Sequence, residues 1–245
     1  MTATPSPASR SRRERPAKPA LTRGGIVAAA VALMRAEGLE RVTMRRLAQE
    51  LDTGAASLYV YVRNTAELHA AILDELLGAV ELGPARAAGD WRERLAAVLT
   101  SYTELLFEHP GLARSALVAR PSGECYLELL EALLALLDEG GVPPERAAWA
   151  VDLLLQHATA TAAEQATRDQ AATADAADAR AEQDALAAAL TGADGTRHPR
   201  IAALGAELLA GSGEHRLAWG FQVLISGILC TPRPDRPEDT HPRST

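Results

Sequence analysis

The sequence is poor in the residues that build β-sheets. Phenylalanine, tyrosine and tryptophan make up only 4% of its 245 residues, whereas alanine recurs in runs such as residues 28–30 and 187–189. Alanine is the strongest helix former, and aromatic and β-branched side chains favour strands. The composition therefore predicts an all-α protein, of one large domain or two modest ones.

The sequence also lacks the patterns of several other protein classes. Its two cysteines, Cys125 and Cys230, show no metal-type spacing, which excludes a disulfide scaffold. No apolar run reaches the roughly 18 residues of a membrane span, and no apolar core directly follows the basic start as in a signal peptide. Motifs of catalytic, metal and dinucleotide sites are absent. We expect a cytoplasmic protein that is not an enzyme and holds no metal or cofactor.

The formal net charge of −7 hides a strong asymmetry. Residues 1–65 carry 11 basic and five acidic side chains, a net of +6, and residues 66–245 carry 14 basic and 27 acidic ones, a net of −13. Such a division suggests a basic module that meets a polyanion, attached to an acidic body that does not.

Helical periodicity and capping residues predict about ten helices and no strand. We expect a disordered basic arm (1–19), a DNA-binding domain (20–80), a larger helical domain (81–231) and a disordered tail (232–245). The arm is equally compatible with a plain tail and with a minor-groove or nonspecific DNA role. Residues 169–198 have few large apolar side chains and are expected to be mobile. The predicted helices cover about 22–37, 43–51, 55–62, 65–77, 90–109, 112–119, 122–139, 144–168, 199–209 and 214–229.

Two short helices in the basic module surround the turn Asp52-Thr53-Gly54. This arrangement fits a helix-turn-helix, in which one helix braces and the next enters the major groove of DNA. The strings Val42-Thr43-Met44-Arg45-Arg46-Leu47-Ala48 and Ser57-Leu58-Tyr59-Val60-Tyr61-Val62-Arg63-Asn64 flank the turn.

With these strings, residues 22–77 resemble the N-terminal domain of the TetR family of bacterial repressors. The body is similar to that of the tetracycline repressors, through Trp91, Tyr102, His109 and the last helix. The resemblance implies a repressor that binds a palindromic DNA operator as a homodimer and is released by a small-molecule inducer. An all-α enzyme or carrier is the alternative, and salt-sensitive retention on heparin would separate the two.

The expected DNA contacts follow from side-chain chemistry. Small residues at the start of the reading helix permit close approach to base edges, and Arg45 can bind guanine through both guanidinium arms. Tyr59 and Tyr61 can offer phenols to phosphate, although Tyr59 is also compatible with a core position; Arg46 is expected to be a solvated or phosphate-facing charge. Thr22, Thr43 and Arg63 are expected to clamp phosphates. The predicted DNA-binding residues are Thr22, Thr43, Arg45, Ala55, Ala56, Ser57, Tyr59, Tyr61 and Arg63.

A ligand pocket is expected between the helices that begin at Asp90, Ser122 and Pro144. His109 can instead cap a helix end, and His157 can face either the pocket or the subunit interface. The predicted pocket residues are Tyr102, Phe107, His109, Trp149, Leu153 and His157. The last helix is expected to form the dimer interface through the apolar stripe Leu217, Phe221, Leu224, Ile225 and Ile228.

Magnesium-tetracycline is not the expected inducer. The resemblance aligns the metal-binding histidines of the tetracycline repressors with Glu81 and Ala116, and their ligand-binding asparagine with Val98. Glu164 matches the acidic residue that acts at that metal from the partner subunit, but one carboxylate makes a poor magnesium site. We expect a mostly apolar, drug-like inducer or a secondary metabolite.

Overall fold

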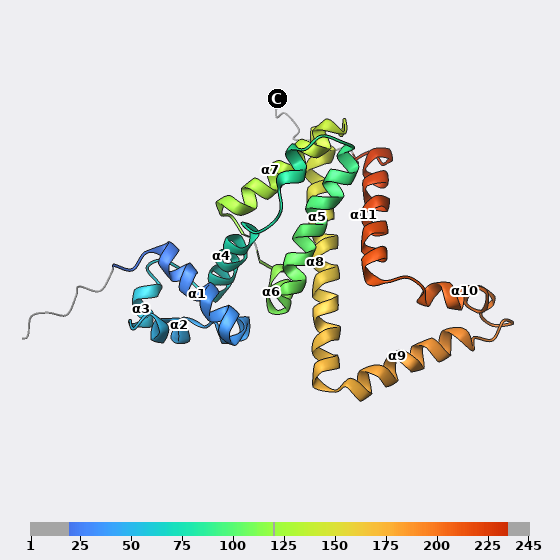
Figure 1. Ribbon diagram of the computed structural model, residues 1–245, viewed down its shortest axis with the longest axis horizontal. Coiled ribbons are helices and arrows are strands. Elements are labelled where there is room, and N and C mark those ends of the chain that lie inside the picture. Colours follow the sequence, from blue (N-terminus) through green and yellow to red (C-terminus); the bar gives the residue numbers. More distant parts are fainter. Residues whose placement is uncertain (1–19, 120, 235–245) are drawn as a thin grey trace, which may run out of the picture.

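The computed structural model describes residues 20–119 and 121–234, and within them the chain is helical and contains no strand, as predicted (Figure 1). The basic arm and residues 235–245 of the tail lie outside the described residues. The 11 α-helices and two 3-10 turns are α1 (Arg23–Glu37), η1 (Leu39–Arg41), α2 (Met44–Glu50), α3 (Ala55–Leu58), α4 (Thr65–Leu77), η2 (Gly83–Arg86), α5 (Trp91–Glu108), α6 (Pro110–Ala116), α7 (Glu124–Glu139), α8 (Pro144–Ala174), α9 (Ala176–Thr191), α10 (Pro199–Leu209) and α11 (Gly213–Cys230).

Helices α1 to α4 form a small unit that we call the head. Its core contains Ile26, Leu47 and Leu58, all of them inaccessible to solvent. Helix α1 ends at Gly38, whose φ of +88° lies in the region that glycine tolerates best. Helix α4 packs against α1 within the head and also against α7, so it joins the head to the rest of the molecule.

Helices α5 to α11 form the body. The long helix α8 packs against α5, α6 and α7, and α11 lies along both α5 and α8 (Figure 1). Leu99, Leu133 and Leu154 are fully buried between these helices. Leucine and alanine fill this core, which explains how the chain packs with so few aromatic residues.

Two predicted elements differ in the structure. Residues 169–198, expected to be mobile, continue α8 to Ala174 and then form α9. Their alanine content supports helices, and Asp175 caps α9 by accepting hydrogen bonds from the backbone N–H groups of Ala177 and Asp178. The reading helix is also shorter than predicted: α3 ends at Leu58, and residues 59–61 form turns instead of continuing the helix to Val62.

Helices α9 and α10 project from the body as a hairpin (Figure 1). No residue of α9 is buried, and only Gly205 is buried in α10. Four leucines of this hairpin are between 40% and 56% exposed: Leu186, Leu204, Leu208 and Leu209. An apolar surface of this kind within a single chain marks a site of contact with another molecule.

Candidate functional site

The turn between α2 and α3 fixes how the reading helix leaves the head. Asp52 adopts a positive φ of 47°, a conformation that aspartate tolerates better than most residues. The backbone N–H of Thr53 donates to the carbonyl of Ala48 at 2.9 Å, which closes the turn. On the far side, Leu58 and Val62 are fully buried and anchor α3 and its continuation. The opposite surface of α3 is consequently held outward.

That outward surface consists of small side chains. Ala56 and Ser57 are exposed and Ala55 is half-buried, so a groove of DNA could approach the α3 backbone closely. Tyr59 is 52% exposed, which rules out its alternative role as part of the core. Arg45 is also exposed, near the start of α2.

The two threonines expected to clamp phosphates cap helices in the structure. The hydroxyl of Thr22 accepts from the backbone N–H of Gly25 at 3.0 Å, and that of Thr43 accepts from Arg46 at 3.2 Å. Both side chains remain exposed, so their hydroxyls can still donate a hydrogen bond. The caps hold the first turns of α1 and α2, whose free N–H groups carry partial positive charge.

Tyr61 and Arg46 have partners within the head. The Tyr61 hydroxyl donates to the carbonyl of Leu21 at 2.8 Å, so this phenol is engaged and does not point freely toward a phosphate. Arg46 binds Glu37 at 2.5 Å and Glu50 at 2.9 Å, and these contacts lower the pKa of Glu37. Arg46 thus ties α1 to α2 while its side chain stays 32% exposed, and its role as a solvated or phosphate-facing charge stays a prediction.

Arg63 remains available at the edge of the head. Its side chain is 86% exposed, although its Nε donates to the Glu67 carboxylate at 2.9 Å. The pKa of Glu67 is lowered by hydrogen bonds from the backbone and side chain of Arg63. An exposed guanidinium with one neighbouring carboxylate can exchange that partner for a phosphate at little cost.

In the body, the predicted pocket residues lie in several separate places. Tyr102 lies inside, where its hydroxyl shares a hydrogen bond of 2.7 Å with Thr159, and burial raises the pKa of the phenol. His157 lies between α8 and α11, edge-on to the Phe221 ring at 5.6 Å between centroids. Its Nε2 is buried without a hydrogen-bond partner. The two residues thus contact different neighbours of α8: Tyr102 reaches Thr159 from α5, and His157 meets Phe221 of α11.

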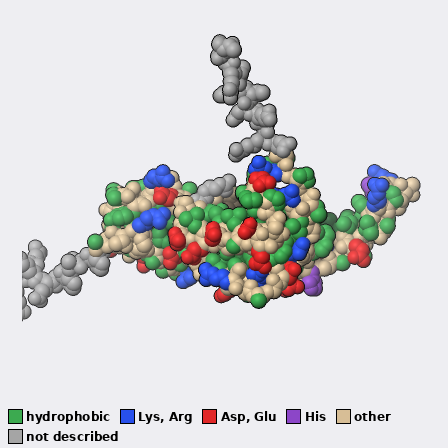
Figure 2. Space-filling model, turned by 90° about the horizontal axis from the view of Figure 1, so that it is seen from above, with side chains coloured by type: hydrophobic (Ala, Val, Ile, Leu, Met, Phe, Trp, Pro, Cys, Tyr) green, Lys and Arg blue, Asp and Glu red, His purple; other side chains and the backbone are tan. Residues whose placement is uncertain are grey.

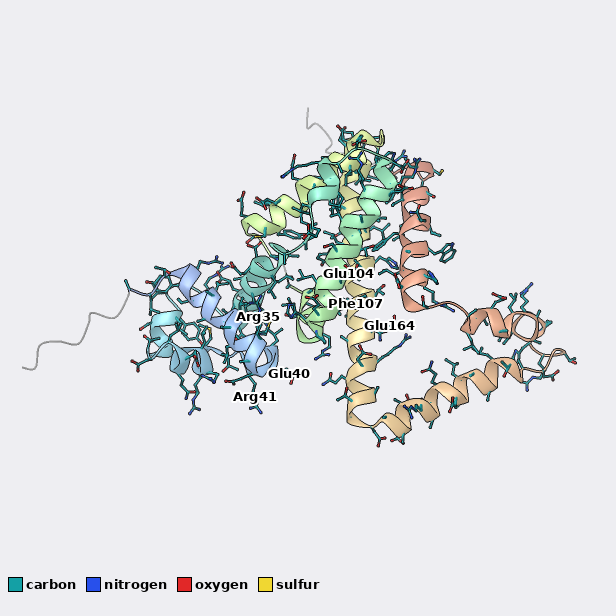
Figure 3. The ribbon with its side chains drawn as sticks, viewed as in Figure 1. Arg35, Glu40, Arg41, Glu104, Phe107 and Glu164 are labelled. Atoms are coloured by element: carbon teal, nitrogen blue, oxygen red, sulfur yellow. The ribbon has the colours of Figure 1, made fainter. Side chains whose placement is uncertain are left out.

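The other pocket candidates lie elsewhere. His109 lines a cleft of about 280 Å³ between the head and the junction of α5 with α6, and burial lowers the pKa of its imidazole. Phe107 is 38% exposed on the surface of α5 (Figure 3). Trp149 and Leu153 lie on the outer face of α8, in an open groove of about 620 Å³. The six residues therefore do not line one cavity.

The stripe predicted for the dimer interface is used within the chain. Phe221 and Ile225 are fully buried, and Leu217 and Ile228 are each 7% exposed, because α11 packs this face onto α5 and α8. These four residues cannot form a face that a partner covers, and Leu224 is half-buried beside them. The outward face of α11 instead carries Trp219, 70% exposed, and Val223, 47% exposed.

Sequence reasoning missed Trp219 and Val223. They are spaced by four residues, like the buried stripe, but lie on the opposite face of the same helix. The signal was present, since α11 is apolar around most of its circumference and such a helix must be covered on more than one side.

Of the three positions aligned with the metal and drug contacts of tetracycline repressors, two carry apolar side chains and the third carries a single carboxylate, Glu81. Val98 is fully buried and Ala116 is half-buried, while the backbone N–H of Glu81 donates to Ser101 Oγ at 2.9 Å. Among the described residues, no group of three or more His, Cys, Asp and Glu side chains could hold a metal ion. None of the helices in the same ranges has the length and apolarity needed to cross a bilayer.

Comparison with known families agrees with this architecture. Residues 26–72 match the model of the bacterial regulatory proteins of the tetR family, and residues 83–231 match the tetracyclin repressor-like C-terminal domain. The chain belongs to the TetR family. This TetR-family protein is also 29% identical over 215 residues to the HTH-type transcriptional repressor DrrR1 of Streptomyces coeruleorubidus, covering 86% of this chain and 78% of that one. With an HTH-type transcriptional regulator of Saccharopolyspora erythraea it is 34% identical over 121 residues, which span 48% of this chain and about half, 51%, of that regulator.

Two solved structures are similar over most of this TetR-family chain. A transcription regulator of Streptomyces coelicolor, SCO7704, is 61% identical with a TM-score of 0.74, and the match covers 89% of this chain and all of that one, 100%. The ActR protein of Streptomyces coelicolor, solved in complex with actinorhodin, is 34% identical with a TM-score of 0.74, covering 85% and 95% of the two chains. The TetR-family protein is thus a transcription regulator with an N-terminal helix-turn-helix domain and a helical C-terminal domain.

Proposed function

We propose that the protein is a ligand-responsive transcriptional repressor that binds a palindromic operator as a homodimer through α3. The outward surface of α3 carries this proposal: Ala56 and Ser57 are exposed on a helix whose other side is anchored in the head core. Arg45 and Arg63 flank this surface with exposed positive charge. Small residues for close approach and arginines for bases and phosphates are the elements of major-groove reading.

The inducer occupies the interior of the body around Tyr102, Thr159 and His157. These side chains supply a hydroxyl pair and an imidazole nitrogen, and the surrounding leucines and Phe221 supply apolar contacts. Such a lining suits a mostly apolar aromatic compound with a few polar groups. The complex of ActR with actinorhodin supports this ligand class. Magnesium-tetracycline does not fit, because Ala116 and Val98 offer neither a metal ligand nor a hydrogen bond.

Three contacts join α6 to the head and can transmit a shift within the body. Arg114 pairs with Glu40 at 3.4 Å, and Ser115 Oγ lies 3.4 Å from His69 Nδ1. Gly111 packs so closely that an added Cβ would lie 3.1 Å from the Cβ of Leu39. A ligand that displaces α6 would therefore tilt the head, and its higher affinity for the tilted state would release the operator.

A second copy of the chain covers the outward face of α8 and α11. Trp149 and Leu153 on α8 and Trp219 and Val223 on α11 are between 43% and 70% exposed in the single chain. The α9–α10 hairpin carries four more exposed leucines. Helices α8 and α11 of two subunits would then form a four-helix bundle. Because both subunits would use the same face, the dimer would have the two-fold symmetry that a palindromic operator requires.

Selection of operator sequences from a random duplex library tests the reading head. Arg45→Ala should cost about 1–3 kcal/mol at one base step and relax specificity there. Arg63→Ala is the matched control, because loss of a phosphate contact weakens all sequences about equally. Unchanged affinity of the Arg45→Ala and Tyr59→Ala proteins for the selected operator would show that α3 and its surroundings do not read DNA.

The inducer is tested separately, by release of the selected operator. Aromatic metabolites with few polar groups should release it, and Tyr102→Phe or His157→Phe should shift the required concentration. Release by tetracycline at low micromolar concentration in the presence of magnesium would contradict the proposed site chemistry.

A further inference from the structure

A cleft of about 280 Å³ lies between the head and the body. The end of α1 and the start of η1 form its head wall, and the end of α5 with the start of α6 forms its body wall. No residue of α3 lines it, and neither do Tyr102, His157 and Thr159. The cleft is therefore separate from the proposed reading surface and from the proposed inducer site.

The bottom of the cleft is apolar. Met34 and Leu39 line it from the head and Leu112 from the body, and all three are between 1% and 7% exposed. The two walls meet where Gly111 packs against Leu39, since an added Cβ at this glycine would lie 3.1 Å from the Leu39 Cβ. A ligand in the cleft would thus contact the head and the body together.

Two opposite charges face the cleft from its two walls. Arg35, in the last turn of α1, lines it from the head, and Glu108, the last residue of α5, lines it from the body. Both act on the same imidazole: burial lowers the pKa of His109, Glu108 opposes this shift and Arg35 adds to it. Neither Arg35 nor Glu108 forms an ion pair or a side-chain hydrogen bond with any described residue.

The position of Glu108 favours a cation at the body wall. A carboxylate at the C-terminal end of a helix is unfavourable, because the last carbonyl groups already carry partial negative charge. A positively charged group bound there would be stabilised by both the carboxylate and the end of α5. At the head wall, the guanidinium of Arg35 can hold a carboxylate through two parallel hydrogen bonds.

The volume and the charges together define a ligand class. Pockets for drug-sized compounds measure about 300–1,000 Å³, so a cleft of about 280 Å³ suits a smaller molecule. Figure 2 shows acidic side chains gathered along the middle of the upper face of the molecule, whereas the cleft presents one unpaired charge of each sign.

We propose that this cleft binds a small zwitterion of the α-amino acid type with an apolar side chain. The carboxylate of the ligand pairs with Arg35 and its ammonium group with Glu108. The apolar side chain lies over Met34 and Leu39 at the bottom of the cleft. The ligand therefore supplies the two partners that these charged side chains lack within the described residues.

Such a ligand would regulate the proposed repressor. Because it bridges the two walls, it holds the head at its present angle to the body and opposes the tilt through which an inducer releases the operator. By linkage, it should raise the inducer concentration that release requires. This consequence rests on the proposed function, whereas the binding itself does not.

NMR of labelled methionine methyl groups tests the binding without DNA. The chain has three methionines: Met34 lines the cleft, Met44 is buried in the head core and does not line it, and Met1 lies outside the described residues. L-leucine is titrated into the full-length protein, and Met34→Leu identifies the Met34 signal. A ligand this small should bind an open cleft with a Kd of about 1 mM. We expect the Met34 signal to shift and the Met44 signal to stay in place.

Two analogues of the probe separate its charges. Isoamylamine is leucine without the carboxylate, and isocaproate is leucine without the ammonium group. Each should bind at least about threefold more weakly than L-leucine, because one of the two exposed charge pairs is lost.

Charge variants assign each pair to its residue. Arg35→Gln should remove the advantage of L-leucine over isoamylamine, and Glu108→Gln its advantage over isocaproate. The matched controls Arg41→Gln on η1 and Glu104→Gln on α5 remove the same charges at positions that do not line the cleft (Figure 3). These controls should leave all three affinities unchanged, and thermal unfolding curves verify that every variant folds.

Three results would overturn the proposal. The first is an unshifted Met34 signal at about 20 mM L-leucine, roughly 20 times the expected Kd. The second is an analogue that binds as tightly as L-leucine, and the third is a pair of variants, Arg35→Gln and Glu108→Gln, that bind all three compounds like the parent.

Operator binding separates this site from the proposed function. If the Met34 signal shifts as expected but the protein binds no operator, the proposed function fails and the site stands. If both hold, saturating L-leucine should raise the inducer concentration needed for release several-fold, and Arg35→Gln/Glu108→Gln should abolish this increase. An inducer concentration that L-leucine leaves unchanged would overturn the regulatory consequence alone.

Discussion

The buried hydrogen bond between Tyr102 and Thr159 allows an asymmetric prediction. Both residues are almost fully buried, at 5% and 6% exposure, and their hydroxyls lie 2.7 Å apart. Removing one partner of such a bond leaves the other hydroxyl without a partner, which costs about 1–3 kcal/mol. The two single variants should nevertheless differ, because the two hydroxyls that remain have different alternatives.

In Tyr102→Phe, the Thr159 hydroxyl can rotate to the backbone carbonyl four residues earlier. Thr161 and Thr167 on the same helix already donate in this way, at 2.9 Å and 2.8 Å. The cost should therefore be near the lower limit, about 1 kcal/mol. In Thr159→Val the phenol of Tyr102 has no comparable acceptor on its own helix, so the cost should approach about 3 kcal/mol.

The double variant Tyr102→Phe/Thr159→Val removes both hydroxyls and should be less destabilised than Thr159→Val alone. Urea unfolding at a fixed protein concentration measures the free energies of this double-mutant cycle. In thermal unfolding, each kcal/mol lost should lower Tm by about 2–4 °C. The reasoning is refuted if Tyr102→Phe costs more than Thr159→Val, or if the two single costs simply add.

Three further outcomes are expected. Trp219→Ala should weaken self-association, measured by sedimentation, at least about tenfold. The control Val118→Ala changes a side chain that is 80% exposed beyond α6, and it should leave self-association unchanged. If Trp219→Ala also leaves the dimer unchanged, α11 is not part of the interface. Gly123→Ala should destabilise the folded protein by about 1–3 kcal/mol, because the added Cβ would overlap the Asp74 carboxylate. At Gly24 an added Cβ meets open space, so Gly24→Ala should be neutral or stabilising. Equal thermal stability of the two variants would contradict this. Burial lowers the pKa of His69 below its usual 6.5. The contribution of neutral His69 to the free energy of unfolding should therefore be complete above pH 6.5 and decline as the pH falls toward the pKa of His69 in the folded protein. His69→Gln should flatten this decline in urea titrations between about pH 7.5 and 5.5, and an unaltered slope would mean that other groups cause the decline.

The sequence predicted the helices well where caps and breaks are local. Gly38, the Asp52-Thr53-Gly54 turn and the proline at the start of α10 set boundaries that the structure reproduces closely. Helix α9 and the end of α8 were missed because the low apolar content of residues 169–198 was interpreted as mobility. In the structure, alanine propensity makes the helices, and low apolar content determines only that α9 is unburied.

The site could be predicted less completely, since side-chain partners depend on tertiary contacts. The sequence contains Arg46 and Glu37 nine residues apart, and only the packing of α2 on α1 brings them together. The same applies to Tyr61, whose hydroxyl is engaged by a backbone carbonyl 40 residues away. Periodicity identified an apolar stripe on α11 but could not decide which of two apolar faces packs inside the chain.

The ion pairs of the head have a consequence for thermodynamic measurements on DNA. Of the arginines at positions 20–65, Arg46 is held by two carboxylates, whereas Arg63 has one carboxylate partner that a phosphate can replace. Arg23, Arg35, Arg41 and Arg45 form no ion pair among the described residues. Only an arginine that takes a phosphate as its partner displaces a condensed counterion from DNA. The head should therefore contribute at most about 4.5 to the slope of log K against log salt concentration, fewer released ions than its arginine count suggests.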